Sequence, residues 1–264
     1  MPVLLKVKNL RVEFNLNNDI FTAVKDVSLE IAEKETVVLA GESGSGKSIT
    51  ALSLTKILPK NARIVSGEVF FRGQDLIKID QRMLVKIRGK EIAYIFQEPT
   101  SYLNPVYTIG DQIMEAIMLH QEKSRFEARA ETLNLLSQVK IADPERVILD
   151  YPHQLSGGMN QRAFIAMCLA CSPKILIADE PTTSLDVTIE SAVLELLKGL
   201  QQKFGFSLLF ITHNLSIAKK IADKICIMYQ GKVVEAGNAG DIFDRPKHPH
   251  TKELISAYQQ IGKL

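Results

Sequence analysis

Residues 41–48 constrain this chain more than any other stretch, because they read Gly-Glu-Ser-Gly-Ser-Gly-Lys-Ser. An apolar run, Thr36–Ala40, precedes them, and a helix-like stretch over residues 49–58 follows. This is the strand–loop–helix setting that the phosphate-loop pattern G-x-x-x-x-G-K-[ST] requires. Its glycines let successive backbone N–H groups turn inward around an anion. The stretch therefore predicts a site for the phosphates of a nucleotide, which we expect to be ATP.

The residues of this loop have distinct expected roles. Lys47 supplies a mobile charge for the β- and γ-phosphates, and the hydroxyl of Ser48 is placed to bind Mg²⁺. The start of the following helix adds unpaired N–H groups and the positive end of its dipole. ATP and Mg²⁺ are thus the expected cofactors. The remaining phosphate contacts are expected from Gly41, Ser43, Gly44 and Gly46.

Composition excludes some classes of protein. The chain has 264 residues and a formal net charge of +2, so it lacks the basic surplus that nucleic acid would demand, and we expect no nucleic-acid partner. Its start lacks the order of a signal peptide, and no apolar run approaches the roughly 18 residues of a spanning helix. Any membrane role is therefore expected to come through partners. The three cysteines, Cys168, Cys171 and Cys226, suit a reducing cytosol, and we expect small buried hydrophobes rather than metal ligands.

The first third of the chain is predicted to be rich in strands, forming an antiparallel layer beside the nucleotide core. The strand candidates are residues 4–7, 10–14, 27–31 and 67–71. Phe14 and Phe21 flank a polar turn, and either ring can stack on an adenine base. Spacing alone favours ordinary strand packing for both.

Between about residues 100 and 152 the pattern changes to helices, at 109–120 and 124–139. Ser124 and Glu127 fit a capping box. We expect this block to be an inserted helical lobe. Beyond it, buried strands alternate with helices, which predicts a parallel sheet with right-handed crossovers. The expected helices are 158–171, 188–203 and 214–222, and the expected strands are 175–178, 207–212 and 224–229.

The strand at 175–178 leads into two acids, Asp179 and Glu180. A carboxylate at the end of a strand can hold the water shell of Mg²⁺ opposite Ser48. Glu180 can orient or deprotonate the water that attacks the γ-phosphate. Two adjacent acids can also be plain surface charge, but in a chain with a phosphate loop we prefer the functional interpretation.

Further motifs carry a resemblance to a family. Residues 155–162 read Leu-Ser-Gly-Gly-Met-Asn-Gln-Arg, which resembles the LSGGQ signature of ATP-binding cassette (ABC) ATPases. Gln97 resembles the Q-loop glutamine, residues 184–186 resemble the D-loop, and His213 resembles the switch histidine. These motifs occur in the family's order over nearly the whole chain. The resemblance implies an α/β P-loop NTPase fold of the ABC ATPase type, with a mostly parallel core sheet, an antiparallel β layer and an inserted α-helical subdomain.

The resemblance also implies a domain organisation and a set of site residues. We expect one ABC ATPase domain over 1–264, with its core in 1–98 and 153–235, a helical subdomain at 99–152 and a tail at 236–264. The implied catalytic residues are Glu180, His213 and Gln97, and the implied metal-binding residues are Ser48, Gln97 and Asp179. The implied nucleotide contacts outside the phosphate loop are Phe14 on the adenine, with Phe21 as the fallback, and Ser156, Gly157, Gly158 and Asp186.

The signature lies at the start of a predicted helix, which offers a second N-terminus to phosphate. One chain cannot easily direct both helix starts at one γ-phosphate. A complete site therefore requires a dimer, and the resemblance implies a head-to-tail one, with ATP between the phosphate loop of one subunit and the signature of the other. Met159 and Asn160 replace the commoner glutamine and arginine, and we expect little effect because both follow the glycines.

A narrower resemblance links residues 97–105 and 109–113 to the ATPases of peptide and nickel importers. Residues 245–251 are similar to that subfamily's "HPYT" segment, with His250 where tyrosine is usual. A Pro-punctuated loop is preferred there to a metal site at His248 and His250. Because the chain stops soon after, a nickel or metal–metallophore importer is slightly favoured over a dipeptide one.

The resemblance implies an ATP-hydrolysing importer subunit at the cytoplasmic face of the cell membrane, powering uptake of peptides or of nickel and metal chelates. Its expected partners are two membrane permeases, a second and different ABC ATPase, and, indirectly, an extracytoplasmic solute-binding protein. The alternative is a soluble ABC ATPase of DNA repair or translation, but the coiled-coil insertions or paired cassettes usual there are absent. A non-hydrolysing regulatory module is disfavoured because Glu180 and His213 are both present.

Overall fold

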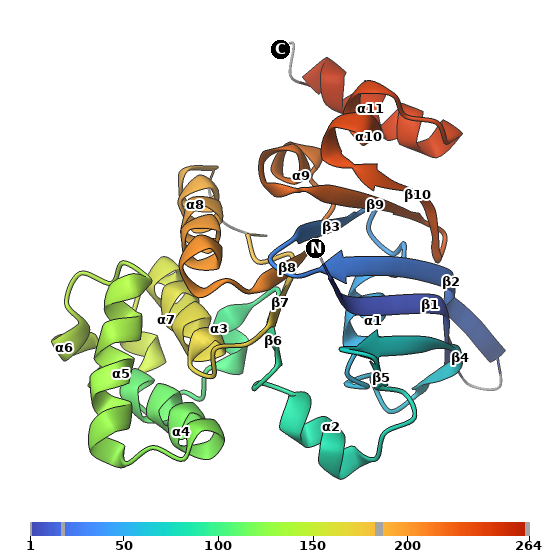
Figure 1. Ribbon diagram of the computed structural model, residues 1–264. Helices are drawn as coiled ribbons and strands as arrows, with labels where there is room; N and C mark the ends of the chain where they lie inside the picture. Colours follow the sequence, from blue (N-terminus) through green and yellow to red (C-terminus); the bar gives the residue numbers. More distant parts are fainter. Residues whose placement is uncertain (1, 17–18, 183–186, 262–264) are drawn as a thin grey trace. The chain divides into compact units, whose positions relative to one another are not determined.

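A computed structural model of the chain (Figure 1) describes residues 2–16, 19–182 and 187–261. The chain forms two compact units. The first consists of Met1–Val85 and Ser207–Leu264, and the second of Lys86–Phe206. Each has its own strands and helices.

The first unit is built on one sheet, with the strand order β5-β4-β1-β2-β10-β9-β3-β8. One part of it is antiparallel, because β1 pairs with β2 and β4, and β4 pairs with β5. In the other part, β3 lies between β8 and β9 and runs parallel to both. The strands are β1 Val3–Leu16, β2 Asp19–Ala32, β3 Thr36–Ala40, β4 Ala62–Phe71, β5 Gln74–Asp75, β8 Ser207–Thr212, β9 Lys224–Tyr229 and β10 Lys232–Asn238.

Burial explains the two parts of this sheet. Every residue of β3 and β8 is buried, as parallel strands covered on both faces require. Buried and exposed residues alternate along much of β2, which suits a strand with one solvated face. The helices of this unit are α1 Lys47–Ser53, α9 Leu215–Ile221, α10 Ala239–Asp244 and α11 Pro249–Ile261, and α2 Gln81–Ile87 begins here and ends in the second unit.

The second unit combines a parallel strand pair with a group of helices. β6 (Ile92–Ile95) and β7 (Ile175–Asp179) pair in parallel register. Helix α7 contacts α3, α4, α5 and β6, so it is central to the packing of this unit (Figure 1). The helices are α3 Pro99–Tyr102, α4 Ile109–Gln121, α5 Arg125–Gln138, α6 Pro144–Val147, α7 Gly157–Leu169 and α8 Val187–Phe204, with a 3₁₀ turn at Pro152–Gln154.

The predicted fold class is confirmed, since parallel core strands, an antiparallel layer and a block of helices are all present. The capping box is also confirmed, because Ser124 Oγ accepts from the backbone N–H of Glu127 and the Glu127 carboxylate accepts from that of Ser124. The expected division into core, helical subdomain and tail stays a prediction.

Two local expectations were wrong. The strand candidates 4–7 and 10–14 belong to one strand, because Asn9 adopts a positive φ of 46° and the pairing shifts register around it without ending. Helix α11 includes His250, which the sequence placed in a loop, since Pro249 occupies the first helical turn. Proline suits that position because the first N–H groups of a helix have no intrahelical partner.

Candidate nucleotide-binding site

The phosphate loop leaves β3 at Gly41 and enters α1 at Lys47. A side chain at Gly41 would place its Cβ 2.1 Å from the carbonyl oxygen of Met228. Gly46 has a φ of 103°, and a Cβ there would lie 2.6 Å from the carbonyl oxygen of Ala23. The loop therefore lies tightly against β2 and β9, and only glycine fits at these two positions.

Lys47 is 5% exposed although it carries a positive charge. Its Nζ donates to the carbonyl oxygens of Gly41 and Glu42, at 2.8 Å each. Nearby, the buried Oγ of Ser45 has no hydrogen-bond partner among the described residues. A buried ammonium group and a spare hydroxyl inside a glycine-lined loop fit a polyanionic phosphate chain.

A pocket of about 470 Å³ lies beside the loop, between β2 and the turn that joins β9 to β10. It is lined by Ile20, Phe21, Thr22, Ala23, Lys25, Gly44, Gln230 and Gly231. Gly231 joins the loop to β2, because its N–H donates to the carbonyl oxygen of Ser45 at 3.0 Å and its own carbonyl oxygen accepts from the backbone N–H of Lys25 at 2.7 Å. Phe14 faces Phe21 as its cross-strand partner, and the Phe21 side chain is 55% exposed. The choice between the two rings as the adenine platform stays a prediction.

His213 follows β8, the parallel neighbour of β3. Ala40 and Thr212 are partners in register, so Gly41 and His213 leave adjacent strands at the same edge of the sheet. The expected switch histidine is thus beside the phosphate loop in the topology of the first unit. Its side chain is exposed.

In the second unit, Ile95 of β6 and Ala178 of β7 are partners in register. The segments after them, with Gln97 on one side and Asp179 and Glu180 on the other, therefore leave adjacent parallel strands at one edge. Glu180 has a φ of 45°, in the left-handed region that costs a non-glycine residue about 1 kcal/mol or more. Such a backbone, on an acid expected to act on the attacking water, favours a functional turn.

A row of aromatic rings connects the Gln97 segment to the helices. Phe96 stacks on Tyr94 with ring centroids 5.7 Å apart, and on Tyr102 of α3 at 4.2 Å. Tyr102 in turn contacts Phe164 of α7 at 6.2 Å. The ring of Phe96, the residue before Gln97, is thus packed against α3, and α3 contacts α7 through Tyr102.

The signature opens helix α7. Ser156 is its N-cap, and Ser156 Oγ accepts a hydrogen bond from the backbone N–H of Met159 at 3.3 Å. The next two side chains are buried amides. Asn160 donates to the carbonyl oxygen of Pro152 at 2.9 Å, and Gln161 donates to that of Pro181. Gln161 was not among the residues expected from the sequence. Its spacing from Phe164, Ile165 and Cys168 on α7 was a signal of burial, but not of its contact with Pro181.

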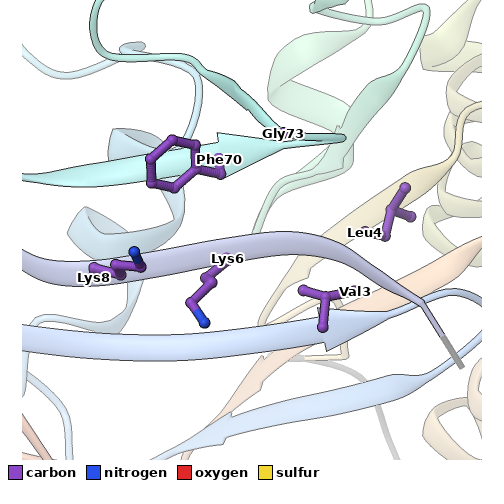
Figure 2. Close-up of a pocket in the computed structure, with 6 residues that line it drawn as sticks. All are labelled: Val3, Leu4, Lys6, Lys8, Phe70 and Gly73. Atoms are coloured by element: carbon purple, nitrogen blue, oxygen red, sulfur yellow. The ribbon is translucent and has the colours of Figure 1, made fainter.

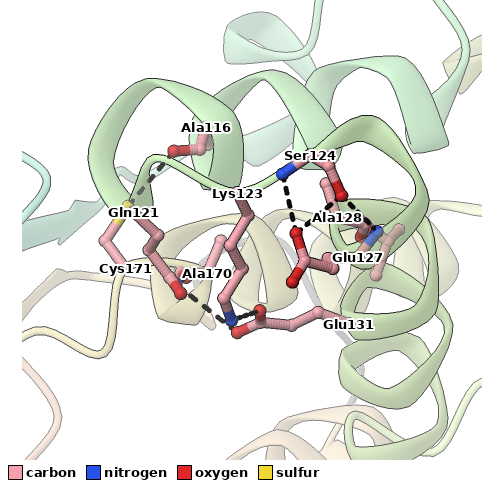
Figure 3. Close-up of polar contacts among 10 residues, drawn as sticks. Ala116, Gln121, Lys123, Ser124, Glu127, Ala128, Glu131, Ala170 and Cys171 are labelled. Carbon is pink, nitrogen blue, oxygen red and sulfur yellow. Dashed lines mark hydrogen bonds and ion pairs between the residues drawn. The ribbon is translucent and has the colours of Figure 1, made fainter.

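Polar contacts attach the far end of α7 to the other helices (Figure 3). Gln121 at the end of α4 donates to the carbonyl oxygen of Ala170. The Sγ of Cys171 contacts the carbonyl oxygen of Ala116 at 3.6 Å. Burial raises the pKa of the Cys171 thiol to about 11, so it stays protonated. The turn between α4 and α5 is therefore joined to the signature helix.

A second hollow, of about 350 Å³, lies over β1 and β4 (Figure 2). Lys8 contacts Glu68 at 3.7 Å and the ring of Phe70 at 5.2 Å, and Lys6 pairs with Glu30. The cations of this hollow are already engaged within the sheet. We assign no ligand to it.

The remaining expected residues are placed as follows. Asp186 lies outside the described residues. Exposed side chains or backbone are found at Ser43, Gly44, Ser48, Gln97, Ser156 and Gly157. The first unit contains the phosphate loop and His213. The second unit contains Gln97, Asp179, Glu180 and the signature. Their assignment to ATP, Mg²⁺ and catalysis stays a prediction.

Comparisons with known proteins agree with these motifs. The model of the family described as "ABC transporter" matches residues 24–183. A probable peptide ABC transporter ATP-binding protein, y4tR, of Sinorhizobium fredii is 45% identical over 97% of this chain and 76% of its own length. The glutathione import ATP-binding protein GsiA of Salmonella choleraesuis is 45% identical over 98% of this chain. The match covers 43% of GsiA, so this chain spans less than half of that relative.

Solved structures resemble the fold. The ATP-binding cassette MJ0796, solved as a dimer in a post-hydrolysis state with ADP and Pi, has a TM-score of 0.79 at 30% identity. That match covers 89% of this chain and 98% of the cassette. The cbiO1 protein of Clostridium perfringens, part of the ABC transporter complex cbiONQ, also has a TM-score of 0.79, at 25% identity, over 100% of this chain and 98% of its own. The chain therefore belongs to the ABC transporter family and is one of its ATP-hydrolysing cassettes.

Proposed function

We propose that this chain is the ATPase subunit of an importer for peptides. The observation that carries the proposal is the buried Lys47 ammonium, held inside a glycine-lined loop, in a chain 45% identical to a probable peptide transporter ATP-binding protein. The two relatives described above are named for peptides and glutathione, so peptides are the first cargo to test. Nickel or metal chelates, which the sequence resemblance favoured, are the second.

The proposed site divides its roles among the chain's own residues. Lys47 and the loop N–H groups bind the phosphates, and Ser48, Gln97 and Asp179 are the oxygen donors that suit Mg²⁺. Bound Mg²⁺ would supply charge neutralisation at the phosphates. Glu180 would accept the proton of the attacking water.

The second half of each ATP site is proposed to come from another cassette. In each site, one cassette would contribute the phosphate loop and His213. The other cassette would contribute Ser156, Gly157 and Gly158, which would contact the γ-phosphate of the same ATP. This dimer can pair identical chains or, as the sequence resemblance implies, this chain with a different ABC ATPase. The MJ0796 cassette, similar over 89% of this chain, has been solved as a dimer.

The proposed partners in the membrane are permeases, which would hold the chain at the cytoplasmic face of the membrane. Among the described residues, no helix is long and apolar enough to cross a bilayer. The proposed docking surface for a permease segment is on the second unit, and it is supported by the exposed Val106, Tyr107 and Leu149, at 72%, 55% and 69%. Their segments run side by side, since the N–H groups of Ile109 and Gly110 donate to the backbone at 150 and 148. A solute-binding protein would deliver cargo to the permeases from the other side.

The test is an uptake assay in cells carrying the chain together with candidate membrane permeases. Labelled dipeptide, glutathione and nickel chelate are offered separately, to wild type and to the Glu180→Gln variant. We expect uptake of a peptide substrate that the variant lowers about a hundredfold, in the range that a general base contributes. Uptake of nickel chelate alone would replace the proposed cargo. Uptake of none, with the ATPase recovered only from ribosomal or DNA-bound fractions, would favour the DNA-repair or translation type.

A further inference from the structure

The signature helix and the Glu180 turn are joined inside the second unit by one buried side chain. Gln161 lies in the second turn of α7, is 3% exposed, and donates through Nε2 to the carbonyl oxygen of Pro181. Pro181 directly follows Glu180, whose φ of 45° places the carboxylate-bearing residue in a left-handed turn. The hydrogen bond therefore restrains the peptide next to the turn that orients Glu180.

The burial of this amide is not explained by stability. Its Oε1 is also buried and has no hydrogen-bond partner among the described residues. An unsatisfied buried acceptor is destabilising, and an apolar side chain of similar length would avoid it. The arrangement resembles that of a functional site, where a local cost is tolerated because it fixes a geometry.

The neighbouring residue offers a comparison. Asn160 is 4% exposed, donates to the carbonyl oxygen of Pro152, and also has a buried oxygen without a partner in the described chain. Its contact lies on the N-terminal side of the signature, whereas that of Gln161 lies beside Glu180. The two amides thus share burial and chemistry but differ in what they restrain.

We propose that Gln161 is a positioning residue for hydrolysis, which fixes the Glu180 turn relative to the signature helix. This inference rests on the proposed role of Glu180. Without the Nε2 donor, the Pro181 peptide can rotate and the carboxylate loses its alignment with the attacking water. Misalignment on the scale of 1 Å can cost about a hundredfold in rate. ATP binding, which depends on the phosphate loop, is not expected to change.

The experiment compares Gln161→Met and Asn160→Leu with wild type in the full-length chain. Methionine matches the length of glutamine but donates no hydrogen bond, and Asn160→Leu removes an equally buried amide from the preceding position of the same helix. We expect Gln161→Met to lower kcat for ATP at least tenfold with KM and melting temperature nearly unchanged, and Asn160→Leu to keep kcat within about threefold. Equal losses in both variants, or a loss of kcat that follows a loss of stability, would overturn the proposal.

A double-mutant comparison separates this inference from the proposed function. In a Glu180→Gln background, single-turnover hydrolysis should show no further loss on Gln161→Met, since residues that act through one another are not additive. An additive loss would show that Gln161 acts elsewhere. If Glu180→Gln alone leaves hydrolysis unchanged, the proposed role of Glu180 fails. If Glu180→Gln stalls turnover but Gln161→Met does not, only the inference about Gln161 fails.

Discussion

Single residues of the phosphate loop show how backbone geometry and charge act together. Gly46 needs a positive φ and has no room for a Cβ, because Ala23 approaches to 2.6 Å. The adjacent Lys47 is buried and held by backbone carbonyls. The loop conformation is therefore required for packing against β2, and it also holds the cation that is proposed to contact phosphate.

Gly46→Ala is predicted to disturb both stability and nucleotide binding. The left-handed conformation and the clash should lower the free energy of unfolding by more than about 2 kcal/mol. ATP affinity should fall at least tenfold, as measured by a fluorescent nucleotide analogue. Gly199→Ala is the control, because Gly199 lies inside α8 with open space around its Cβ direction and should gain stability of about 0.5 kcal/mol. Normal ATP affinity in Gly46→Ala would contradict the role assigned to this glycine.

At the scale of elements, the start of α11 is attached to the sheet of the first unit. Glu235 of β10 accepts from the backbone N–H groups of Lys247 at 2.8 Å and His248 at 2.9 Å. The ring of His250 stacks on Tyr229, at the end of β9, with centroids 3.8 Å apart. The substitution of histidine for the usual tyrosine thus keeps a planar ring against the strand.

The contribution of Glu235 is predicted to depend on pH. Partial burial would raise its pKa, but the nearby Thr251 side chain and the N–H groups of His248 and Lys247 outweigh burial and lower the pKa below 4.5. Because the pKa is lowered in the folded state, the ionised Glu235 adds to the free energy of unfolding. This contribution is fully present above about pH 4.5 and is lost as the pH falls through the folded-state pKa. Glu235→Gln should therefore lower the melting temperature at pH 7 by an amount corresponding to about 1 kcal/mol, and have little effect near pH 3. Glu253→Gln is the control. The Glu253 side chain is 79% exposed, so this variant should leave the melting temperature unchanged at both pH values.

The loop that carries Val106 and Tyr107 is held by one amide of α4. Gln112 accepts from the N–H of Asn104 at 2.8 Å and donates to the carbonyl oxygens of Asn104, Tyr107 and Thr108 at 3.1, 3.1 and 3.3 Å. A side chain with this many backbone contacts determines the loop's conformation. The proposed docking surface therefore depends on it.

Gln112→Leu is predicted to separate partner binding from hydrolysis. We expect the variant to lose co-purification with the permeases from detergent-solubilised membranes, while the isolated chain keeps its ATPase rate within about twofold. The cost in stability should be about 1–2 kcal/mol, from the lost hydrogen bonds. Gln138→Leu, which removes one contact to Asn134 within α5, is the control and should still co-purify. If Gln112→Leu still co-purifies with the permeases, the docking surface does not depend on this loop and the proposed location is wrong.

At the scale of the whole molecule, the residues proposed for hydrolysis belong to both compact units. Lys47 and His213 lie in one, and Glu180 and Ser156 lie in the other. If ATP is held between two cassettes, as proposed above, binding of ATP should favour their association.

ATP-driven association is the prediction at this scale. Glu180→Gln should bind ATP, stall turnover and accumulate a dimer, detected by light scattering after size-exclusion chromatography. Adding Ser156→Arg should abolish the dimer, because a long side chain would occupy the space of the phosphate contact. The same protein with ADP is the control and should stay monomeric. A dimer that forms equally well with Ser156→Arg would exclude the head-to-tail arrangement proposed above.

The sequence by itself determined the family, the fold class and the order of the motifs. Phosphate-loop chemistry is local, since glycine conformations, the following helix and Lys47 all lie within one short stretch. The capping box at Ser124 and the strand that ends in Asp179 were equally readable, because their signals are also local.

Only the tertiary structure decided which distant residues support that chemistry. Gln161 and Pro181 are 20 residues apart, and nothing in the local pattern of either indicates their hydrogen bond. The sequence also did not indicate that residues 4–7 and 10–14 form one strand, because the bulge at Asn9 depends on Gly67 of β4, where a Cβ would clash with the backbone of Asn9 and Leu10. His250 could be placed against Tyr229 only once helix α11 and strand β9 were packed together. Local sequence specifies conformation and chemistry, whereas contacts across the chain depend on how the elements pack.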